Sequence, residues 1–301
     1  MLPPSRQRRY RYLLPMNQAP TIIIEPGRRP KAYLADLWRY RDLIWLFVKR
    51  DFTAAYKQTI LGPLWHFIKP ILTTLVSFVL FNVVAGISTN GTHPVLFQMS
   101  GIIIWNYFAA CFTTTGNTFL ANAGIFGKVY FPRLVTPISV VISQLVQFGI
   151  QLVLLLVVTA YFMITQGPCV VSQCSLFTVN WLLVPVILLL MAALGLGAGI
   201  ILSSITTKYR DLAVLVGFGI QLLMYASAVN YPVSALAKHP QLYLLVRYNP
   251  LAALVESFRN AVLGGSIPWG MLAYSAGITA LLLALGIWLF SRVERTFMDT
   301  V

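Results

Sequence analysis

Residues 34–87 read LADLWRYRDLIWLFVKRDFTAAYKQTILGPLWHFIKPILTTLVSFVLFNVVAGI, a basic amphipathic segment that runs without a linker into a long apolar one. At about 100° per residue, most apolar side chains of the first part fall within one arc. The opposite face carries Asp36, Arg39, Arg50 and Lys57. The first part therefore predicts a helix that lies along a membrane surface, and the second predicts a membrane span. An ordinary anchor helix, whose basic side chains only reach the headgroups, fits the same pattern.

The composition identifies the class of protein before any motif does. Of the 301 residues, 58% are hydrophobic and only 10% are charged, and the mean hydropathy of +0.76 excludes a soluble core. The sequence therefore predicts an all-α integral membrane protein. Six apolar runs are long enough to cross a hydrocarbon layer of roughly 30 Å. These runs lie near Leu64–Ile87, Val95–Ala121, Pro137–Ile164, Trp181–Ile205, Leu212–Tyr231 and Met271–Phe290.

The distribution of basic residues predicts the orientation. Six spans place both termini on the same side of the membrane, and all 22 Lys and Arg residues except Lys238, Arg247 and Arg259 fall on that side. Because cytoplasmic segments carry the excess of Lys and Arg, we expect a multi-pass protein of the bacterial cytoplasmic (inner) membrane with both termini in the cytoplasm. The net charge of +14 is then mainly a topology signal, with attraction to membrane lipid second. Nucleic-acid binding is a poor interpretation of it.

Three segments differ in composition. Residues 1–32 predict a flexible basic cytoplasmic tail, residues 33–60 an amphipathic interface helix, and residues 61–301 the six-span domain. Between the second and third runs, the cytoplasmic loop 122–136 mixes basic and large apolar side chains. Such a loop is typical of a docking surface for another protein, although a loop packed against its own helices has the same composition. The residues concerned are Ile125, Phe126, Lys128, Val129, Tyr130, Phe131 and Arg133.

The two longer outer loops carry different features. Cys169 and Cys174 lie close together in one of them, where an oxidising compartment would permit a disulfide, and their pairing stays open. The other loop, residues 232–270, is too apolar for a free loop and too short for two further spans. It therefore predicts half-inserted helices at the outer face. Its amphipathic part carries Glu256 and Arg259.

The chemistry that the sequence lacks excludes several functions. All eight Asp and Glu residues lie outside the six predicted spans, whereas a proton- or sodium-coupled transporter needs an ionisable group at depth. The sequence has no phosphate-binding G-x-x-x-x-G-K-[ST] motif, so ATP hydrolysis by that route would require a separate subunit. The three histidines lie far apart and form no cluster with the three cysteines, so no metal or cofactor is expected.

Four short strings in a fixed order resemble those of a known family. They are RDFTAAYKQTILGPLW at residues 50–65, KVYFPR at 128–133, KYRDL at 208–212, and YNPL at 248–251 followed by ESFR at 256–259. From about Tyr33 to the C-terminus the chain is similar to the permease subunit of the ABC-2 family of exporters. More narrowly, it resembles the polysaccharide branch, which exports O-antigen, capsule or teichoic acid. The long basic tail before Pro30 departs from the family's pattern.

The resemblance implies a homodimer with a channel between the two copies, driven by two cytoplasmic ABC ATPase subunits. The substrate would be a glycan on a polyprenyl diphosphate carrier, and the chain itself would not be an enzyme. The loop between the second and third spans would couple to the ATPase. The gate residues would be Arg50, Lys57 and Lys69 on the cytoplasmic side, whose charges suit a diphosphate, and Glu256 and Arg259 on the outer side.

Aromatic side chains could stack on the sugar rings along such a channel, although any membrane protein carries aromatic residues in its interfacial belts. The candidates are Phe78, Phe81, Trp105, Tyr107, Phe108, Phe112, Tyr225 and Tyr231. Two other functions remain open at this point: an ABC-2 exporter of a drug or small lipid, and a membrane enzyme of envelope glycan assembly. The enzyme would need outer-side acids, of which the large outer loop offers only Glu256.

Overall fold

The structure is a computed structural model that describes residues 37–56, 62–126, 131–167, 171, 178–206 and 212–297. All regular elements within these ranges are helices, as the sequence predicts. The tail 1–32 lies outside the described residues. So do six of the predicted site residues, namely Lys57, Lys128, Val129, Tyr130, Cys169 and Cys174.

The helices vary widely in length. In chain order they are α2 (Arg41–Tyr56), η2 (Gly62–Leu64), α3 (Trp65–Ser77), the π-helical η3 (Phe78–Val84), α4 (Pro94–Gly116), α5 (Thr118–Phe126), α6 (Val135–Gln166), η5 (Val179–Leu183), α7 (Val184–Thr206), α8 (Leu212–Ala226), η6 (Val233–Lys238), α9 (Pro240–Arg247), α10 (Pro250–Leu263) and α11 (Trp269–Phe297).

Five helical stretches are long and apolar enough to cross a membrane. Each of them coincides with a predicted run, so five of the six expected spans are confirmed by length and composition. The five stretches are Trp65–Val84, Pro94–Gly116, Val135–Gln166, Val179–Thr206 and Trp269–Ser291.

The remaining run, predicted over Leu212–Tyr231, forms only the 15-residue α8. At 1.5 Å per residue its length of roughly 22 Å falls short of the hydrocarbon layer. The helix ends at Ala226 because the chain turns there: Ala228 adopts a positive φ of 52°, and the side-chain amide of Asn249 donates a 3.0 Å hydrogen bond to the Ala226 carbonyl. The described residues therefore contain no sixth helix of spanning length.

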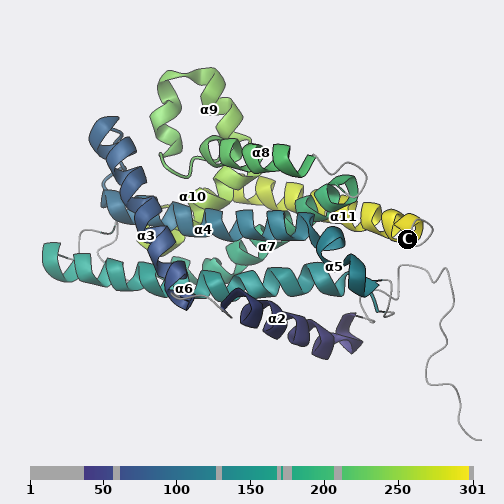
Figure 1. The fold of residues 1–301 in the computed structure, drawn as a ribbon. Coiled ribbons are helices and arrows are strands. Elements are labelled where there is room, and N and C mark those ends of the chain that lie inside the picture. Colours follow the sequence, from purple (N-terminus) through teal and green to yellow (C-terminus); the bar gives the residue numbers. More distant parts are fainter. Residues whose placement is uncertain are drawn as a thin grey trace, which may run out of the picture.

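Helix α4 is the centre of the bundle. Its apolar stretch is 72% buried, against 17% to 44% in the other four spanning stretches. It packs against α6, α7 and α10, while α7 packs along α11 (Figure 1). Most side chains of α4 therefore contact other helices of the same chain, and few of them face lipid.

Small residues let α7 approach its neighbours closely. A Cβ atom at Gly197 would lie 2.8 Å from the Leu283 Cα atom of α11. A Cβ atom at Gly199 would lie 2.7 Å from the Thr115 Cβ atom of α4. Larger side chains at these positions would separate the helices.

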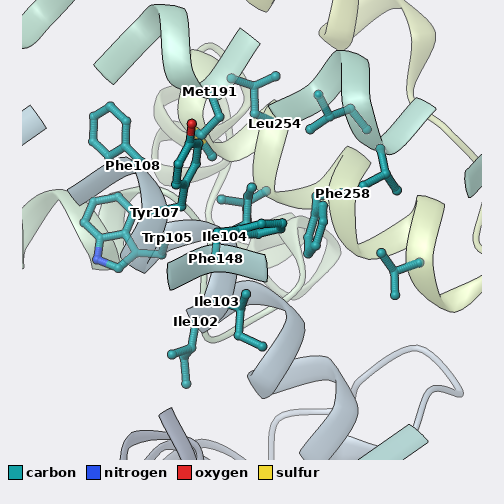
Figure 2. Packing of buried hydrophobic residues seen from close by; sticks show 14 of the residues in the cluster. Ile102, Ile103, Ile104, Trp105, Tyr107, Phe108, Phe148, Met191, Leu254 and Phe258 are labelled. Carbon is teal, nitrogen blue, oxygen red and sulfur yellow. The ribbon is translucent and has the colours of Figure 1, made fainter. Parts of the chain in front are cut away.

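Aromatic rings from three helices meet in the main core. Figure 2 shows Phe148 of α6 beside Phe258 of α10, and the ring centroids lie 5.8 Å apart with an edge-to-face arrangement. On its other side Phe148 contacts Tyr107 of α4, at 5.5 Å. These contacts fix α10 against the spanning helices, although α10 has only 14 residues and is too short to cross a membrane itself.

A second cluster holds α2 against the bundle. Phe47 is buried and meets the Phe131 ring edge to face at 5.7 Å, next to Val135 at the start of α6. Figure 1 shows α2 running beside α6. Trp45 and Leu46, in contrast, are 65% and 59% exposed, so α2 has one face on the protein and a second, apolar face that protein does not cover. This arrangement is the one that an amphipathic surface helix requires.

Candidate functional site

A cavity of about 320 Å³ lies where α2, α5 and α6 meet. Arg50 and Asp51 of α2 line one side of it, and Ser143, Gln144 and Gln147 of α6 line another. The guanidinium of Arg50 contacts the Asp51 carboxylate, with 2.8 Å between Nη2 and Oδ1. It also lies 4.6 Å from the centroid of the Phe47 ring, which anchors α2. The cavity is therefore lined by one ion pair, by several neutral hydrogen-bonding groups and by apolar side chains, among them Phe52 and Val140.

The predicted cytoplasmic gate residues occupy different elements. Arg50 lines the cavity, whereas Lys69 lies on α3 with an exposed side chain. Lys57, the third predicted member, lies outside the described residues. The cluster of three cations therefore stays a prediction. Of its three members, Arg50 lies beside a hollow that could hold a polar group.

The predicted coupling residues are divided between buried and undescribed positions. Phe131 and Arg133 are buried, at 6% and 5% exposure, and Ile125 is half-buried against the same cluster. This placement is the one expected of a loop packed against its own helices. Phe126 ends α5, but its side chain is not described. The part of the loop that could face a partner therefore begins near the end of α5 and lies before Phe131.

Three of the predicted channel aromatics are core residues of this chain. Trp105, Tyr107 and Phe108 are 4% exposed or less, within the cluster that Figure 2 shows. Phe112 stacks on Phe108 with 5.8 Å between the centroids. Because apolar residues occur on every side of α4, the sequence does not indicate which of its aromatic residues face inward. In the part of the chain that the structure describes, Trp105, Tyr107 and Phe108 are not accessible to a sugar.

Two of the predicted aromatics do form an accessible pair. The rings of Phe81 on η3 and Tyr225 on α8 lie 6.4 Å apart, tilted by 33°, and Tyr225 is 53% exposed. The Tyr231 hydroxyl donates a 2.6 Å hydrogen bond to the Tyr225 carbonyl, which holds the turn after α8. Phe78 begins η3 and is half-buried. A platform of adjacent, partly exposed rings can stack on the apolar face of a sugar.

The predicted outer-gate pair lies on α10 and is mostly buried. Arg259 is 4% exposed, and its Nη2 and Nε atoms donate to the carbonyls of Val229 and Phe97, at 2.6 and 3.3 Å. Burial lowers the pKa of Arg259 to about 9, although the nearby Glu256 carboxylate opposes this change. The guanidinium therefore stays protonated at neutral pH. Burial raises the pKa of Glu256, an effect that the charge of Arg259 reduces.

A buried amide network beside Arg259 did not emerge from the sequence. Gln98 of α4 is fully buried and donates to the Asn82 side chain at 3.0 Å and to the Asn230 carbonyl at 2.9 Å. The side-chain oxygens of Gln98 and Asn230 have no hydrogen-bond partner among the described residues. A glutamine inside a predicted span was the available signal, because such a group must find partners within the membrane.

The described residues contain no group of three or more His, Cys, Asp or Glu side chains that could hold a metal ion. Cys111 is a free, buried cysteine within α4. His93 precedes the first residue of α4 and packs against Phe162, with 4.1 Å between the ring centroids. None of the described geometry positions a nucleophile or an acid–base pair.

Comparison with known proteins identifies the family. A model of the family described as "ABC-2 type transporter" matches residues 42–263. An O-antigen export system permease protein RfbA of Klebsiella pneumoniae is 26% identical over 86% of this chain and 94% of its own length. The Myxococcus xanthus protein of the same name is 30% identical over 74% of this chain and 81% of its own.

A further relative is named for the transport of polysialic acid. The polysialic acid transport protein KpsM of Escherichia coli is 24% identical over 83% of this chain and 93% of its own length. The family match covers well over half of the sequence, from within α2 to the end of α10, and all five spanning stretches except Trp269–Ser291 lie inside it. This chain therefore belongs to the ABC-2 type transporter family.

Proposed function

We propose that this chain is the permease subunit of an ATP-driven exporter that moves a polysaccharide linked to a polyprenyl diphosphate across the bacterial cytoplasmic membrane. The observation that carries this proposal is the match to O-antigen export permeases over 81% to 94% of their own length. A match of this extent covers most of each relative, and not only one shared segment.

The proposed assembly is a homodimer of this chain with two cytoplasmic ABC ATPase subunits. Both termini, and with them α2, would lie on the cytoplasmic side, because nearly all basic residues fall there. The exposed apolar faces of η3 and α8 support a channel or a second copy at that surface. They include Val79, Val83, Leu215 and Phe218, each between 47% and 66% exposed.

The Phe81 and Tyr225 pair supports a glycan as the cargo. The two rings come from η3 and α8, and they lie close enough to form one continuous aromatic surface. A sugar ring slides along such a surface without losing a specific hydrogen bond, which suits a polymer that passes through in many equivalent steps. An exporter of small lipids would need no such platform.

Coupling to the ATPase is proposed for the loop that includes Ile125, Phe126, Lys128, Val129 and Tyr130. Burial of Phe131 and Arg133 supports this role indirectly, because it fixes the loop's second end against α2 and α6. A displacement of the loop by the ATPase would then be transmitted to the helices that line the cytoplasmic side. Arg50 lies on one of these helices.

The proposal is tested by extracting the tagged chain from its native membrane in mild detergent. We expect a soluble P-loop ATPase at near-equal stoichiometry, and its ATP hydrolysis should rise when polyprenyl-linked glycan is added to the reconstituted complex. Stimulation by small amphiphiles and not by the glycan would favour the drug or lipid exporter. A chain that co-purifies with no ATPase would contradict the proposal.

The enzyme alternative has its own test in Glu256. If the chain transferred sugars, Glu256→Gln should abolish transfer, because this carboxyl is the only acid in the large outer loop. As a permease residue, Glu256 is half-buried beside Arg259, so the same variant should change only the stability or opening of α10. A glycan-transfer assay on purified membranes distinguishes the two roles.

A further inference from the structure

The cavity between α2, α5 and α6 lies at the depth of lipid headgroups. Helix α6 has 32 residues and is therefore roughly 48 Å long, about 18 Å more than the hydrocarbon layer needs. Counting about twenty residues back from its outer end at Gln166 reaches Gln147. The same count along α4, from Pro94, reaches the neighbourhood of Thr114, which also lines the cavity. Two helices independently place the cavity at one membrane boundary.

The surface beside the cavity is apolar. Leu145 and Val146 of α6 are 42% and 38% exposed, directly next to the cavity-lining Gln144 and Gln147. Phe52 of α2 lines the cavity itself and is 41% exposed. A hollow that contains an ion pair and is bordered by exposed apolar side chains at a membrane boundary is complementary to an amphiphile whose acyl chains lie along α6.

The charges around the cavity favour a zwitterion over an anion. Arg50 could donate to a phosphate, because the two hydrogen bonds to Asp51 use Nε and Nη2 and leave Nη1 available. Asp51 lines the same cavity and supplies a negative charge next to that cation. A diphosphate would be attracted by Arg50 but repelled by Asp51, whereas a headgroup with a phosphate and an ammonium suits both.

Neutral groups complete the lining. Ser143 is 7% exposed, and its hydroxyl has no hydrogen-bond partner among the described residues. Gln144 and Gln147 extend the same face of α6. An unpaired buried hydroxyl costs free energy unless a ligand or water satisfies it, so it points to an occupant with hydrogen-bonding groups.

We infer that this cavity binds the phosphoethanolamine headgroup of a zwitterionic membrane phospholipid, with the phosphate at Arg50 and the ammonium at Asp51. The bound lipid fills the gap between α2 and α6 and so sets the position of the surface helix. The inference takes from the proposed function only the orientation, which makes the leaflet the cytoplasmic one.

The test measures which lipids stay on the full-length chain. The chain is reconstituted in nanodiscs that contain equal amounts of phosphatidylethanolamine and phosphatidylcholine, then released into mild detergent, and the retained lipids are identified by native mass spectrometry. We expect phosphatidylethanolamine to be retained about tenfold over phosphatidylcholine, whose trimethylammonium group cannot donate a hydrogen bond to Asp51. Equal retention of the two lipids by the wild-type chain overturns the inference.

Two pairs of variants identify the groups responsible. Asp51→Asn should remove the preference for ethanolamine, and Arg50→Gln should lower retention of both lipids. Arg41 and Asp42 form a matched control, because they are also neighbours on α2, 3.9 Å apart, but do not line the cavity. Arg41→Gln and Asp42→Asn should leave both lipids unchanged. The same loss in the control pair as in the cavity pair would show a general effect of surface charge and overturn the site.

A second variant and a second retained lipid also test the headgroup assignment. If Asp51→Asn fails to fold, Gln147→Leu removes a hydrogen-bonding group from the opposite wall and should likewise reduce retention of phosphatidylethanolamine. If a polyprenyl diphosphate lipid added to the same nanodiscs is retained instead, and its retention is insensitive to Asp51→Asn, the cavity belongs to the substrate path and the headgroup assignment is wrong. The assay involves no ATPase or glycan transport, so its failure is distinct from failure of the proposed function.

Discussion

The Arg259 guanidinium donates a 2.6 Å hydrogen bond to the backbone carbonyl of Val229, which ties α10 to the turn that follows α8. The same side chain donates to the Phe97 carbonyl of α4 and lies 3.6 Å from the centroid of the Phe97 ring. One buried cation thus joins three segments that are far apart in the sequence. A charge in this position is tolerated because carbonyl oxygens and an aromatic face replace its water.

Replacing Arg259 by Met should therefore destabilise the outer part of the bundle. The change leaves the Val229 and Phe97 carbonyls without their side-chain donor, and we expect the free energy of unfolding to fall by about 2 to 4 kcal/mol. Thermal denaturation of the purified chain in detergent measures this loss. Arg247→Met is the matched control: Arg247 is exposed and contacts only the Tyr243 side chain among the described residues, so its loss should cost about 0.5 kcal/mol or less.

Gly101 of α4 should tolerate no side chain at all. A Cβ atom there would lie 2.5 Å from both the Arg259 Nη2 atom and the Val229 carbonyl oxygen, so Gly101→Ala must displace the hydrogen bond between them. We expect a loss of about 1 to 3 kcal/mol in the same denaturation assay. At Gly149 of α6 a Cβ atom meets nothing within 4 Å, so Gly149→Ala should be neutral or slightly stabilising. Equal effects of the two variants would show that the contact at Gly101 is unimportant.

Length and apolarity were sufficient to predict five spanning helices, because a membrane span needs little else. They were insufficient for α8. That helix ends at Ala226 through a hydrogen bond from Asn249, a residue 23 positions further along the chain. A contact of this kind leaves no periodic signal in the apolar run itself. The close packing of α7, in contrast, depends on local features, namely Gly197 and Gly199 in its own sequence.

The site was harder to predict than the fold for a related reason. The sequence identified Arg50 and Arg259 as special cations, but it could not say that one lines a cavity and the other is buried among carbonyls. Helix α4 is apolar all round, so aromatic residues that pack in the core look the same as aromatic residues that line a channel. Tyr107 is the clearest example, because its side chain is only 3% exposed and packs against Phe148.

The stability of α10 should depend on pH through Glu256. Because burial raises the pKa of Glu256, the folded chain holds this proton to a higher pH than the unfolded chain does. Stability therefore falls as the pH rises from the ordinary glutamate pKa to the raised value in the folded state. Glu256→Gln should match the wild type at about pH 4 and be more stable above the raised pKa. Glu256→Asp, which keeps the carboxyl, should retain the pH dependence. Denaturation midpoints between about pH 4 and 8 decide between these outcomes.

The exposed aromatic pair can be tested by removing one ring. Tyr225→Leu keeps the apolar volume near Phe81 but removes the flat face on which a sugar could stack, so we expect glycan export to fall by about fivefold to tenfold. Insertion and ATPase co-purification should not change. Phe218→Leu on the same helix is the control, because Phe218 is 66% exposed and belongs to no ring pair that the described residues form. A similar loss in both variants would mean that α8 tolerates no change of this kind.

The end of α5 carries the last prediction. Phe126 belongs to the segment proposed to dock on the ATPase, so Phe126→Asp should place a charge in an apolar contact and weaken that association by about tenfold or more. Tyr130→Asp should do the same. Phe131→Asp provides the contrast: Phe131 is buried against Phe47, so its replacement should reduce the stability of the chain itself. Co-purification of the ATPase, compared with the denaturation midpoint of each variant, separates a docking residue from a packing residue. Normal ATPase recovery with Phe126→Asp and Tyr130→Asp would remove this loop from the coupling mechanism.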